Sequence, residues 1–352
     1  MPRSRLTVVL SQAPGKHPAK RSLEESIVAA LIMEPDLEVS VVPNLYDLGP
    51  EHTGRLFLGA VSGDMVVLSW FYSRAAFWLL DRDGIKGQAG ESQLKPPSDD
   101  DDDDAKEETE TPVEGPEAIG AAGEIPDRHI YCLDLRDFNK AEPYLEEIKR
   151  IAAECRDRRE AKNRERAANN PAIIQLGLSI NNSALEVPAH QQAFTPESLL
   201  APPGRRWYPV IDYNRCTNCL ECLDFCLFGV YGVDSVERIL VENQDQCKKG
   251  CPACSRVCPQ QAIIFPEYKS PAIAGSDTGA VGGLKIDLSK LFGGEINDAL
   301  SMAVQERDRE LVNDGRNAVG MSIGIPKRQE GKPQAPKDDL DKLVEDLDKL
   351  DL

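Results

Sequence analysis

The feature that most constrains this chain is a group of eight cysteines between Cys216 and Cys258. They form two sets of four, with the spacing C-x2-C-x2-C-x3-C in the first and C-x3-C-x2-C-x3-C in the second. Three closely spaced cysteines let one loop curl around a metal–sulfur cube and present three thiolates, while the fourth thiolate comes from elsewhere. The spacing therefore predicts a metal centre built from Cys216, Cys219, Cys222, Cys226, Cys247, Cys251, Cys254 and Cys258.

Zinc and disulfide bonds fit this pattern less well. Structural zinc sites usually use two separated pairs of ligands, often with histidine, but no histidine lies between residues 191 and 352. Arg3 and Arg5 precede an apolar run that is too short for a secretory signal, and no small-residue cleavage site follows it. We therefore expect a cytoplasmic protein, in which thiols stay reduced and ten cysteines indicate metal binding.

The two cysteine sets are also embedded in a repeat. Val210 lies six residues before Cys216, and Val241 lies six residues before Cys247. Apolar residues return after the fourth cysteine of each set, at 230–233 and at 262–265. Each half is therefore expected to contain a strand, a cysteine loop, a short helix and a second strand.

With these features, residues 206–268 resemble the bacterial-type ferredoxins that carry two [4Fe-4S] clusters. The resemblance implies a small α+β fold with pseudo-two-fold symmetry, in which each cluster takes its fourth cysteine from the other motif. By that pattern the first cluster would be held by Cys216, Cys219, Cys222 and Cys258. The second would be held by Cys226, Cys247, Cys251 and Cys254.

The chain departs from the ferredoxin pattern at two points. One extra residue separates Cys247 from Cys251, and Gly250 can accommodate it as a bulge because glycine tolerates positive φ. Leu227 stands where the family commonly has a proline, whereas Pro259 keeps it. Neither departure removes a ligand, and the charges of Lys248 and Lys249 would help to set the reduction potential.

Residues 1–167 alternate between strand and helix patterns. Apolar runs at 6–10, 37–42, 65–71 and 129–135 predict buried strands, and helical spacing predicts helices at 22–33, 74–80 and 141–167. This alternation favours an α/β domain with a parallel sheet, flavodoxin-like or Rossmann-like in form. Within it, the segment of about 85–127 contains the acidic run Asp99–Asp104 and is expected to be a disordered insertion.

The remaining segments are expected to be less regular. Residues 168–205 are mixed in composition and contain proline, as a connector would. Residues 269–352 predict a flexible tail that contains a helix at 296–311. The tail ends in an amphipathic helix with a leucine stripe at Leu340, Leu343, Leu347 and Leu350.

Three smaller features have ordinary interpretations. Ser11–Lys16 follows a strand and precedes a helix, where α/β domains bind phosphate, but it matches no phosphate-binding motif and is better read as a plain loop. The basic residues at 156–166 alternate with acidic ones, which favours ion pairs on a solvated helix. Cys132 and Cys155 lie in apolar patterns and are expected to be buried thiols.

Together these patterns favour an electron-transfer protein that exchanges single electrons with a redox protein partner. The net charge of −18 argues against a nucleic-acid binder, and no stretch approaches the ~20 apolar residues of a membrane span. No nucleophile–base motif is visible, so an enzymatic activity is not indicated. Two alternatives stay open: a redox-enzyme subunit whose α/β domain binds a small molecule, and an interaction scaffold with structural or sensory clusters.

Overall fold

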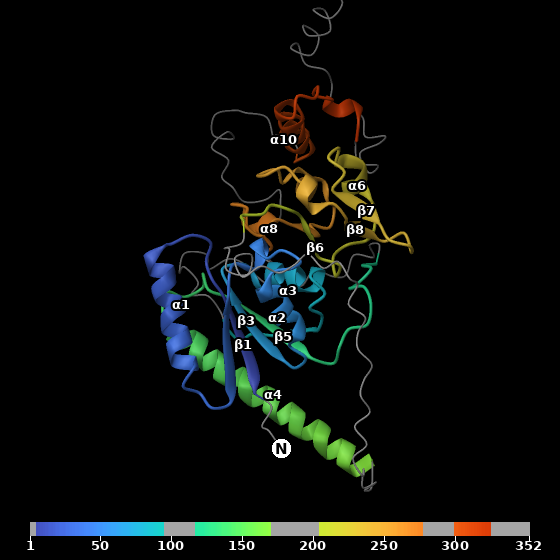
Figure 1. Cartoon of the computed structure of the whole chain (residues 1–352). Helices are drawn as coiled ribbons and strands as arrows, with labels where there is room; N and C mark the ends of the chain where they lie inside the picture. The colour runs from blue at the N-terminus through green and yellow to red at the C-terminus, as the bar shows by residue number, and fades with distance from the viewer. Residues whose placement is uncertain (1–4, 95–116, 170–203, 277–298, 325–352) are drawn as a thin grey trace, which may run out of the picture.

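A five-stranded parallel sheet forms the centre of the N-terminal part of the protein (Figure 1). The computed structural model describes residues 5–94, 117–169, 204–276 and 299–324. The strands are β1 (Leu6–Ser11), β2 (Leu37–Val42), β3 (Met65–Ser69), β4 (Gln88–Gly90) and β5 (His129–Asp134). The predicted parallel α/β sheet is confirmed, and its order is β2-β1-β3-β5-β4. The first three strands follow the flavodoxin-like order, but the last two are exchanged relative to it.

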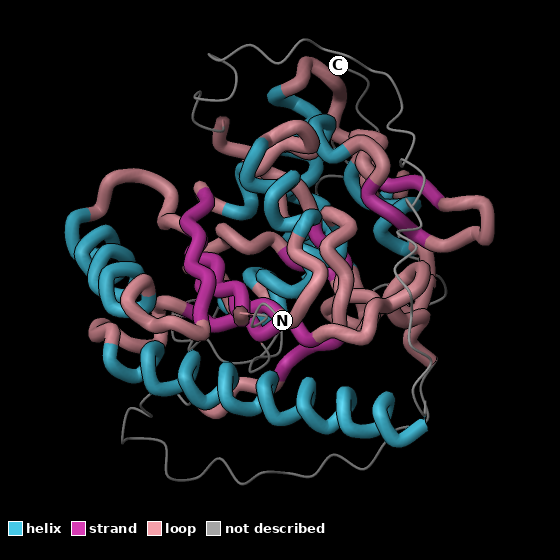
Figure 2. Tube along the Cα trace, turned by 60° about the horizontal axis from the view of Figure 1, so that its bottom comes forward, coloured by secondary structure: helices cyan, strands magenta, loops and turns pink. Residues whose placement is uncertain are grey.

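Helices cover both faces of the sheet. The helices are α1 (Pro18–Leu31), α2 (Thr53–Ala60), α3 (Ser73–Arg82) and α4 (Glu142–Asn169), with a 3-10 turn at Leu45–Asp47. Side chains alternate along each strand, so Val66 of β3 packs with α1 and α4, while Val67 packs with α2 and α3. The long helix α4 crosses beneath the strands in Figures 1 and 2.

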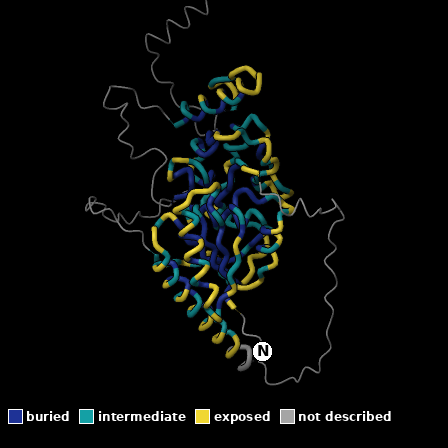
Figure 3. Tube along the Cα trace, turned by 60° about the vertical axis from the view of Figure 1, so that its left-hand side comes forward, coloured by how far each residue is buried: buried dark blue, intermediate teal, exposed yellow. Residues whose placement is uncertain are grey.

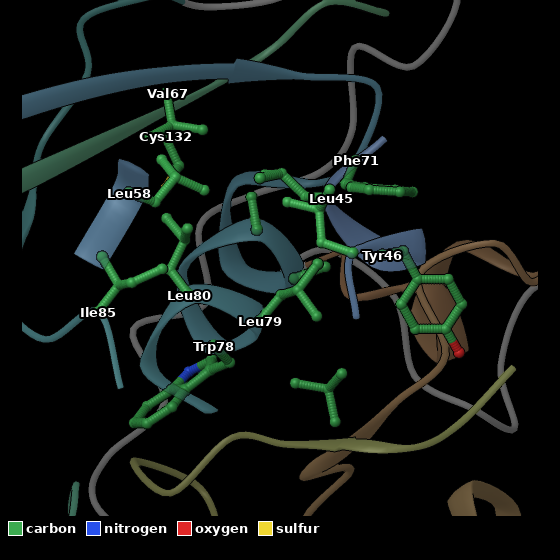
Figure 4. Packing of buried hydrophobic residues seen from close by; sticks show 14 of the residues in the cluster. Leu45, Tyr46, Leu58, Val67, Phe71, Trp78, Leu79, Leu80, Ile85 and Cys132 are labelled. Carbon is green, nitrogen blue, oxygen red and sulfur yellow. The ribbon is translucent and has the colours of Figure 1, made fainter. Parts of the chain in front are cut away.

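The core between the sheet and α3 contains one of the two extra cysteines. Leu58 of α2 and Leu80 of α3 lie against Val67 and Cys132 of the sheet (Figure 4). Cys132 is buried here, and Cys155 is buried on the α4 side. Their prediction as buried thiols is confirmed, and burial raises the pKa of Cys132 to about 12 and that of Cys155 to about 11.

Regular structure extends into the segment that was expected to be a disordered insertion. Residues 85–94 and 117–127 are described, and β4 pairs in parallel with β5 through Gln88, Ala89 and Gly90. Ile85 is also buried. The expectation of disorder from about 85 to 127 was therefore wrong at its ends. At residues 88–90 the pairing with β5 orders the backbone although the local composition favours disorder. Asp99–Asp104 lies outside the described residues.

The cysteine module consists of two similar halves. The first contains β6 (Val210–Ile211), α6 (Glu221–Phe225) and β7 (Tyr231–Val233), and the second contains β8 (Ile239–Val241), α7 (Ala253–Val257) and β9 (Ile263–Ile264). The strands pair between the halves: β6 with β9 and β7 with β8, both antiparallel. Each half thus has the order of strand, loop, helix and strand that the repeat predicts, and the pairing between halves fits the pseudo-two-fold symmetry that the ferredoxin resemblance implies.

The cysteine module packs directly onto the α/β part. Tyr208, Val210 and Ile264 belong to the same buried cluster as α2, α3 and the sheet, and buried segments continue from the sheet into the module in Figure 3. Tyr46 and Tyr208 are buried with ring centroids 4.4 Å apart. The Tyr46 hydroxyl donates to the Tyr208 carbonyl at 2.5 Å and accepts from the Tyr208 N–H at 2.6 Å. The two parts therefore share one core.

A buried ion pair also joins the two parts. The Arg74 guanidinium at the start of α3 lies 3.4 Å from the Asp212 carboxylate, and their side chains are 7% and 3% exposed. Arg74 also donates to the carbonyls of Gln261 and Gly275. Burial raises the pKa of Asp212, and Arg74 opposes that shift. An ion pair at this depth holds its partners in one geometry, because either charge alone would be costly to bury.

Residues after the module are more ordered than expected. Helix α8 (Pro271–Ala274) is buried, so the expectation of a flexible tail from 269 was wrong at its start. Helix α10 (Ala299–Asn313) lies close to the predicted helix at 296–311 and is followed by a 3-10 turn at Gly320–Ser322. Most of the connector at 168–205 and the leucine stripe at 340–350 lie outside the described residues.

Candidate metal centre

Two cavities in the cysteine module are each lined by four cysteines. The first contains about 380 Å³ of space between atoms and is lined by Cys216, Cys219, Cys222 and Cys258. The second contains about 330 Å³ and is lined by Cys226, Cys247, Cys251 and Cys254. The grouping is the crossed one that the ferredoxin resemblance implies.

The crossed grouping follows from the two short helices. Cys222 lies in α6, and Cys226 follows directly after that helix, so one turn of helix separates the two side chains. Cys254 and Cys258 occupy the same positions in and after α7. The packing of α6 beside α7 then brings Cys258 to the first cavity and Cys226 to the second.

The backbone around the cavities contains residues in left-handed conformations. Asn218 and Leu220 have φ of 55° and 60° in the first cysteine loop, and Gly250 has φ of 86° in the second. Gly250 thus provides the bulge predicted from the extra residue after Cys247. Gly229 and Gln261, each three residues after a fourth cysteine, also have positive φ, at 70° and 51°. This shared geometry turns backbone N–H groups toward the cysteine sulfurs.

Several backbone N–H groups point at the sulfurs. The Ala262 N–H donates to the Cys258 Sγ at 3.3 Å. The N–H groups of Phe228, Gly229 and Val230 act on Cys226 and lower its pKa against the effect of burial. In the second cavity the Tyr231 hydroxyl also donates to the Cys254 Sγ at 3.1 Å. Hydrogen bonds of this kind stabilise negative charge on sulfur and tune an iron–sulfur centre.

The electrostatics of the cavities fit a positively charged group bound to the sulfurs. Burial raises the pKa of Cys222 and Cys254 well above the ordinary value, and neighbouring cysteines raise both further. Burial also raises the pKa of Cys251 to about 11. Four thiolates at such a site need a cation, and the metal ions of a cluster provide one. Soft sulfur donors in an apolar cavity therefore fit an iron–sulfur cluster.

Among the described residues, no three His, Cys, Asp or Glu side chains converge as ligands of a single metal ion.

The structure adds two contributions to these cavities that sequence reasoning missed. The Ile119 N–H donates to the Cys216 carbonyl at 2.8 Å, and the Gly120 N–H donates to the Tyr213 carbonyl at 2.9 Å. Arg307 of α10 lines the second cavity. The contacts of residues 119–120 are long-range, so no local sequence pattern indicates them. Arg307 could have been noticed in the sequence, because it is a charged residue at a position of the apolar stripe of α10.

The Ser11–Lys16 loop is held by its own carboxylate. The Ala13 N–H donates to Glu24 Oε1 at 2.6 Å, and the Trp70 indole N–H donates to the same oxygen at 2.8 Å. Glu24 is buried and also pairs with Arg21 at 2.7 Å. A carboxylate therefore occupies the loop where a phosphate-binding domain would place an anion, which supports an ordinary loop.

The basic end of α4 forms the ion pairs expected of a solvated helix. Arg158 and Arg164 pair with residues four positions earlier on α4, Glu154 and Glu160, at 2.9 and 3.2 Å. Lys162 pairs with Asp127 at 2.6 Å. Such pairs contribute little to stability individually, but they neutralise the basic run.

Comparison with known proteins gives one partial match. The chain is 47% identical over 66 residues to a protein of Methanocaldococcus jannaschii named as an uncharacterized ferredoxin. The match covers 18% of this chain and 44% of the other protein's length. No protein-family model and no solved structure matches the chain. The match supports a ferredoxin-like region in a larger protein whose α/β part it does not explain.

No helix in the described ranges is long and apolar enough to cross a membrane.

Proposed function

We propose that this chain is an iron–sulfur electron-transfer protein that carries two [4Fe-4S] clusters and exchanges single electrons with a protein partner. The observation that carries the proposal is the pair of cavities, each lined by four cysteines and otherwise mostly apolar. A cluster of this type, when bound, takes up and releases one electron without a change of ligands.

The ligand sets of the proposal are the two cavity linings. Cys216, Cys219, Cys222 and Cys258 would hold the first cluster, and Cys226, Cys247, Cys251 and Cys254 the second. The chain's role at both sites is to fix the sulfurs, to direct N–H groups at them and to limit access of water.

The two sites differ in exposure. Cys219 is exposed at the first site, whereas Cys251 and Cys254 are buried at the second. We propose that a redox partner approaches the first site, because one of its cysteines, Cys219, is exposed. The second site lies beneath α10, which packs on α7 through Leu300, Ala303 and Val304.

The proposal is tested by metal and spin analysis of protein purified without oxygen. We expect about eight irons and eight sulfides per chain, since each of two cubane clusters contains four of each. The reduced protein should show the EPR signals of two interacting [4Fe-4S]⁺ centres. Stoichiometric zinc without iron, in protein made with ample iron, would overturn the proposal.

Small molecules that co-purify with the protein test the alternative of a redox-enzyme subunit. A flavin or nucleotide that co-purifies in stoichiometric amount would instead favour a redox-enzyme subunit. From β1 the chain adds β2 on one side of the sheet and β3 on the other, so the carboxyl ends of β1 and β3 lie at a topological switch point. Open α/β sheets bind such ligands at this kind of point.

A further inference from the structure

Arg307 is a buried cation on the helix that covers the second cavity. The buried face of α10 includes Leu300, Ala303, Val304 and Leu311, and Arg307 lies on the same stripe. Its side chain is 1% exposed and lines the second cavity. A guanidinium does not lose its proton in proteins, so this wall of the cavity carries a permanent positive charge.

The side chain is held in one position by several partners. Its Nε donates to Asp308 Oδ1 at 3.0 Å, and its two terminal nitrogens donate to the carbonyls of Gly320 and Ile323 at 2.6 and 2.9 Å. The guanidinium carbon lies 4.7 Å from the centre of the Phe225 ring. Arg307 is therefore fixed beside the cavity and does not extend into solvent.

Packing alone does not account for an arginine at this position. Replacing a buried ion pair by apolar residues of similar volume is often neutral or stabilising. Asp308 is one anionic partner of Arg307, and the thiolates that line the same cavity as Arg307 are a second anionic group.

The two cavities also differ in the sign of the charged side chains that line them. Lys248 and Arg307 line the second cavity, whereas Glu221 lines the first. In the repeat, Glu221 corresponds to Ala253, which lies in the second cavity. The module is thus nearly symmetric in backbone but not in charge.

Four carboxylates on or near α10 pair with basic side chains. Asp308 pairs with Arg307, Asp314 pairs with Lys248 at 2.6 Å, and Glu306 pairs with Arg256 at 2.9 Å. Glu310 pairs with Arg309 at 3.1 Å. None of the four carboxylates is among the residues that line the second cavity. Lys248 and Arg307 are therefore the charged side chains that line this cavity, while Glu306 and Glu310 act on Cys251 from outside its lining.

Building on the proposed function, we propose that Arg307 raises the reduction potential of the second cluster. Reduction adds negative charge to a group that four thiolates already make anionic. Burial beneath α10 opposes that added charge, and a fixed cation at the cavity wall compensates. A helix outside the cysteine motif would thus keep the covered cluster reducible.

The test is an EPR-monitored redox titration of the full-length, cluster-loaded chain. Arg307→Gln should shift the potential of the second site downward and leave the first site unchanged. Arg307→Lys, which keeps the charge, should restore most of the shift. Arg309→Gln is the matched control, because it removes an exposed arginine two residues away. Cys222→Ser assigns the two redox steps, because it alters a ligand of the first site only. The step that remains unchanged in this variant belongs to the second site.

A second variant keeps the test decisive if Arg307→Gln fails to retain iron. Asp308→Asn removes the carboxylate paired with Arg307, so it should shift the second site's potential upward. Unchanged potentials, equal shifts at both sites, or a downward shift in Asp308→Asn would overturn the role of Arg307. If the wild-type chain contains no [4Fe-4S] signal at all, the proposed function fails instead, and the two failures are thereby distinguished.

Discussion

Replacing Tyr46 by phenylalanine should destabilise the α/β part and the cysteine module together. The Tyr46 hydroxyl bonds both the carbonyl and the N–H of Tyr208, and both residues are fully buried. Tyr46→Phe keeps the ring and removes only the oxygen. Both backbone groups of Tyr208 then lose their partner in the core that joins the two parts.

The expected loss follows from these two groups. Each buried polar group left without a partner costs about 1–3 kcal/mol. Part of the total is recovered because the hydroxyl no longer has to be desolvated, so we expect a loss of about 3 kcal/mol in unfolding free energy. At roughly 2–4 °C per kcal/mol, the melting temperature should fall by about 6–12 °C.

The assay follows thermal unfolding by helical circular dichroism and by visible absorbance of the clusters on the same sample. Both transitions should move down together, because the two parts share one core. Tyr72→Phe is the control, since the Tyr72 ring packs on the core and on Arg136 while its hydroxyl makes no hydrogen bond within the described residues. A shift of the cluster signal alone, or no shift of either signal, would refute the shared core.

Three further variants test other parts of the account. Gly250→Ala places a side chain at φ of 86°, where nothing lies within 4 Å of the new Cβ, so only backbone strain of about 1–2 kcal/mol should act. This strain should make the second site lose iron faster. Gly63→Ala is the control, because Gly63 also lies in open space but has no positive φ, and it should have no effect. Ile119→Pro removes the N–H that donates to the Cys216 carbonyl, so it should weaken iron retention at the first site in a chelator challenge, while Glu117→Pro should not. Arg74→Met leaves the buried Asp212 carboxylate with Arg215, 3.7 Å away, as its remaining guanidinium, so it should cost about 3 kcal/mol, and Asp212→Asn in the same chain should recover part of that loss. For Gly250→Ala and Ile119→Pro, iron loss equal to that of the control variant would count against the contact. For Arg74→Met, no gain in stability on adding Asp212→Asn would count against the ion pair.

The sequence was informative where function imposes local spacing. Three sulfurs that surround one cluster must lie on one short loop, so the spacing of Cys216, Cys219 and Cys222 is readable without a structure. The apolar strands of the sheet are readable for a similar reason, because a run that is buried on both faces is apolar throughout.

Long-range contacts were not readable in the same way. The short strand β4 contains Gln88, Ala89 and Gly90, which have low strand propensity, and it is stabilised by pairing with β5. Helix α2 contains Gly54 and Gly59 and was not predicted, because glycine weakens a helix in isolation. The contact of Ile119 with the first cysteine loop spans almost a hundred residues, and composition alone suggested disorder there.

Two four-cysteine sites with exchanged fourth cysteines underlie the proposed function. This arrangement is tested most directly by two double variants. Cys226→Ser with Cys251→Ser removes two sulfurs from one cavity, whereas Cys226→Ser with Cys222→Ser removes one sulfur from each cavity. Serine gives a harder oxygen ligand, so an affected cluster should lose iron or change its potential.

Iron counting and EPR on the two double variants decide the question. Crossed ligation predicts about four irons and one intact [4Fe-4S] signal for Cys226→Ser with Cys251→Ser, and two damaged clusters for Cys226→Ser with Cys222→Ser. The reverse result, with both clusters damaged in the first variant and one spared in the second, would contradict the crossed ligation.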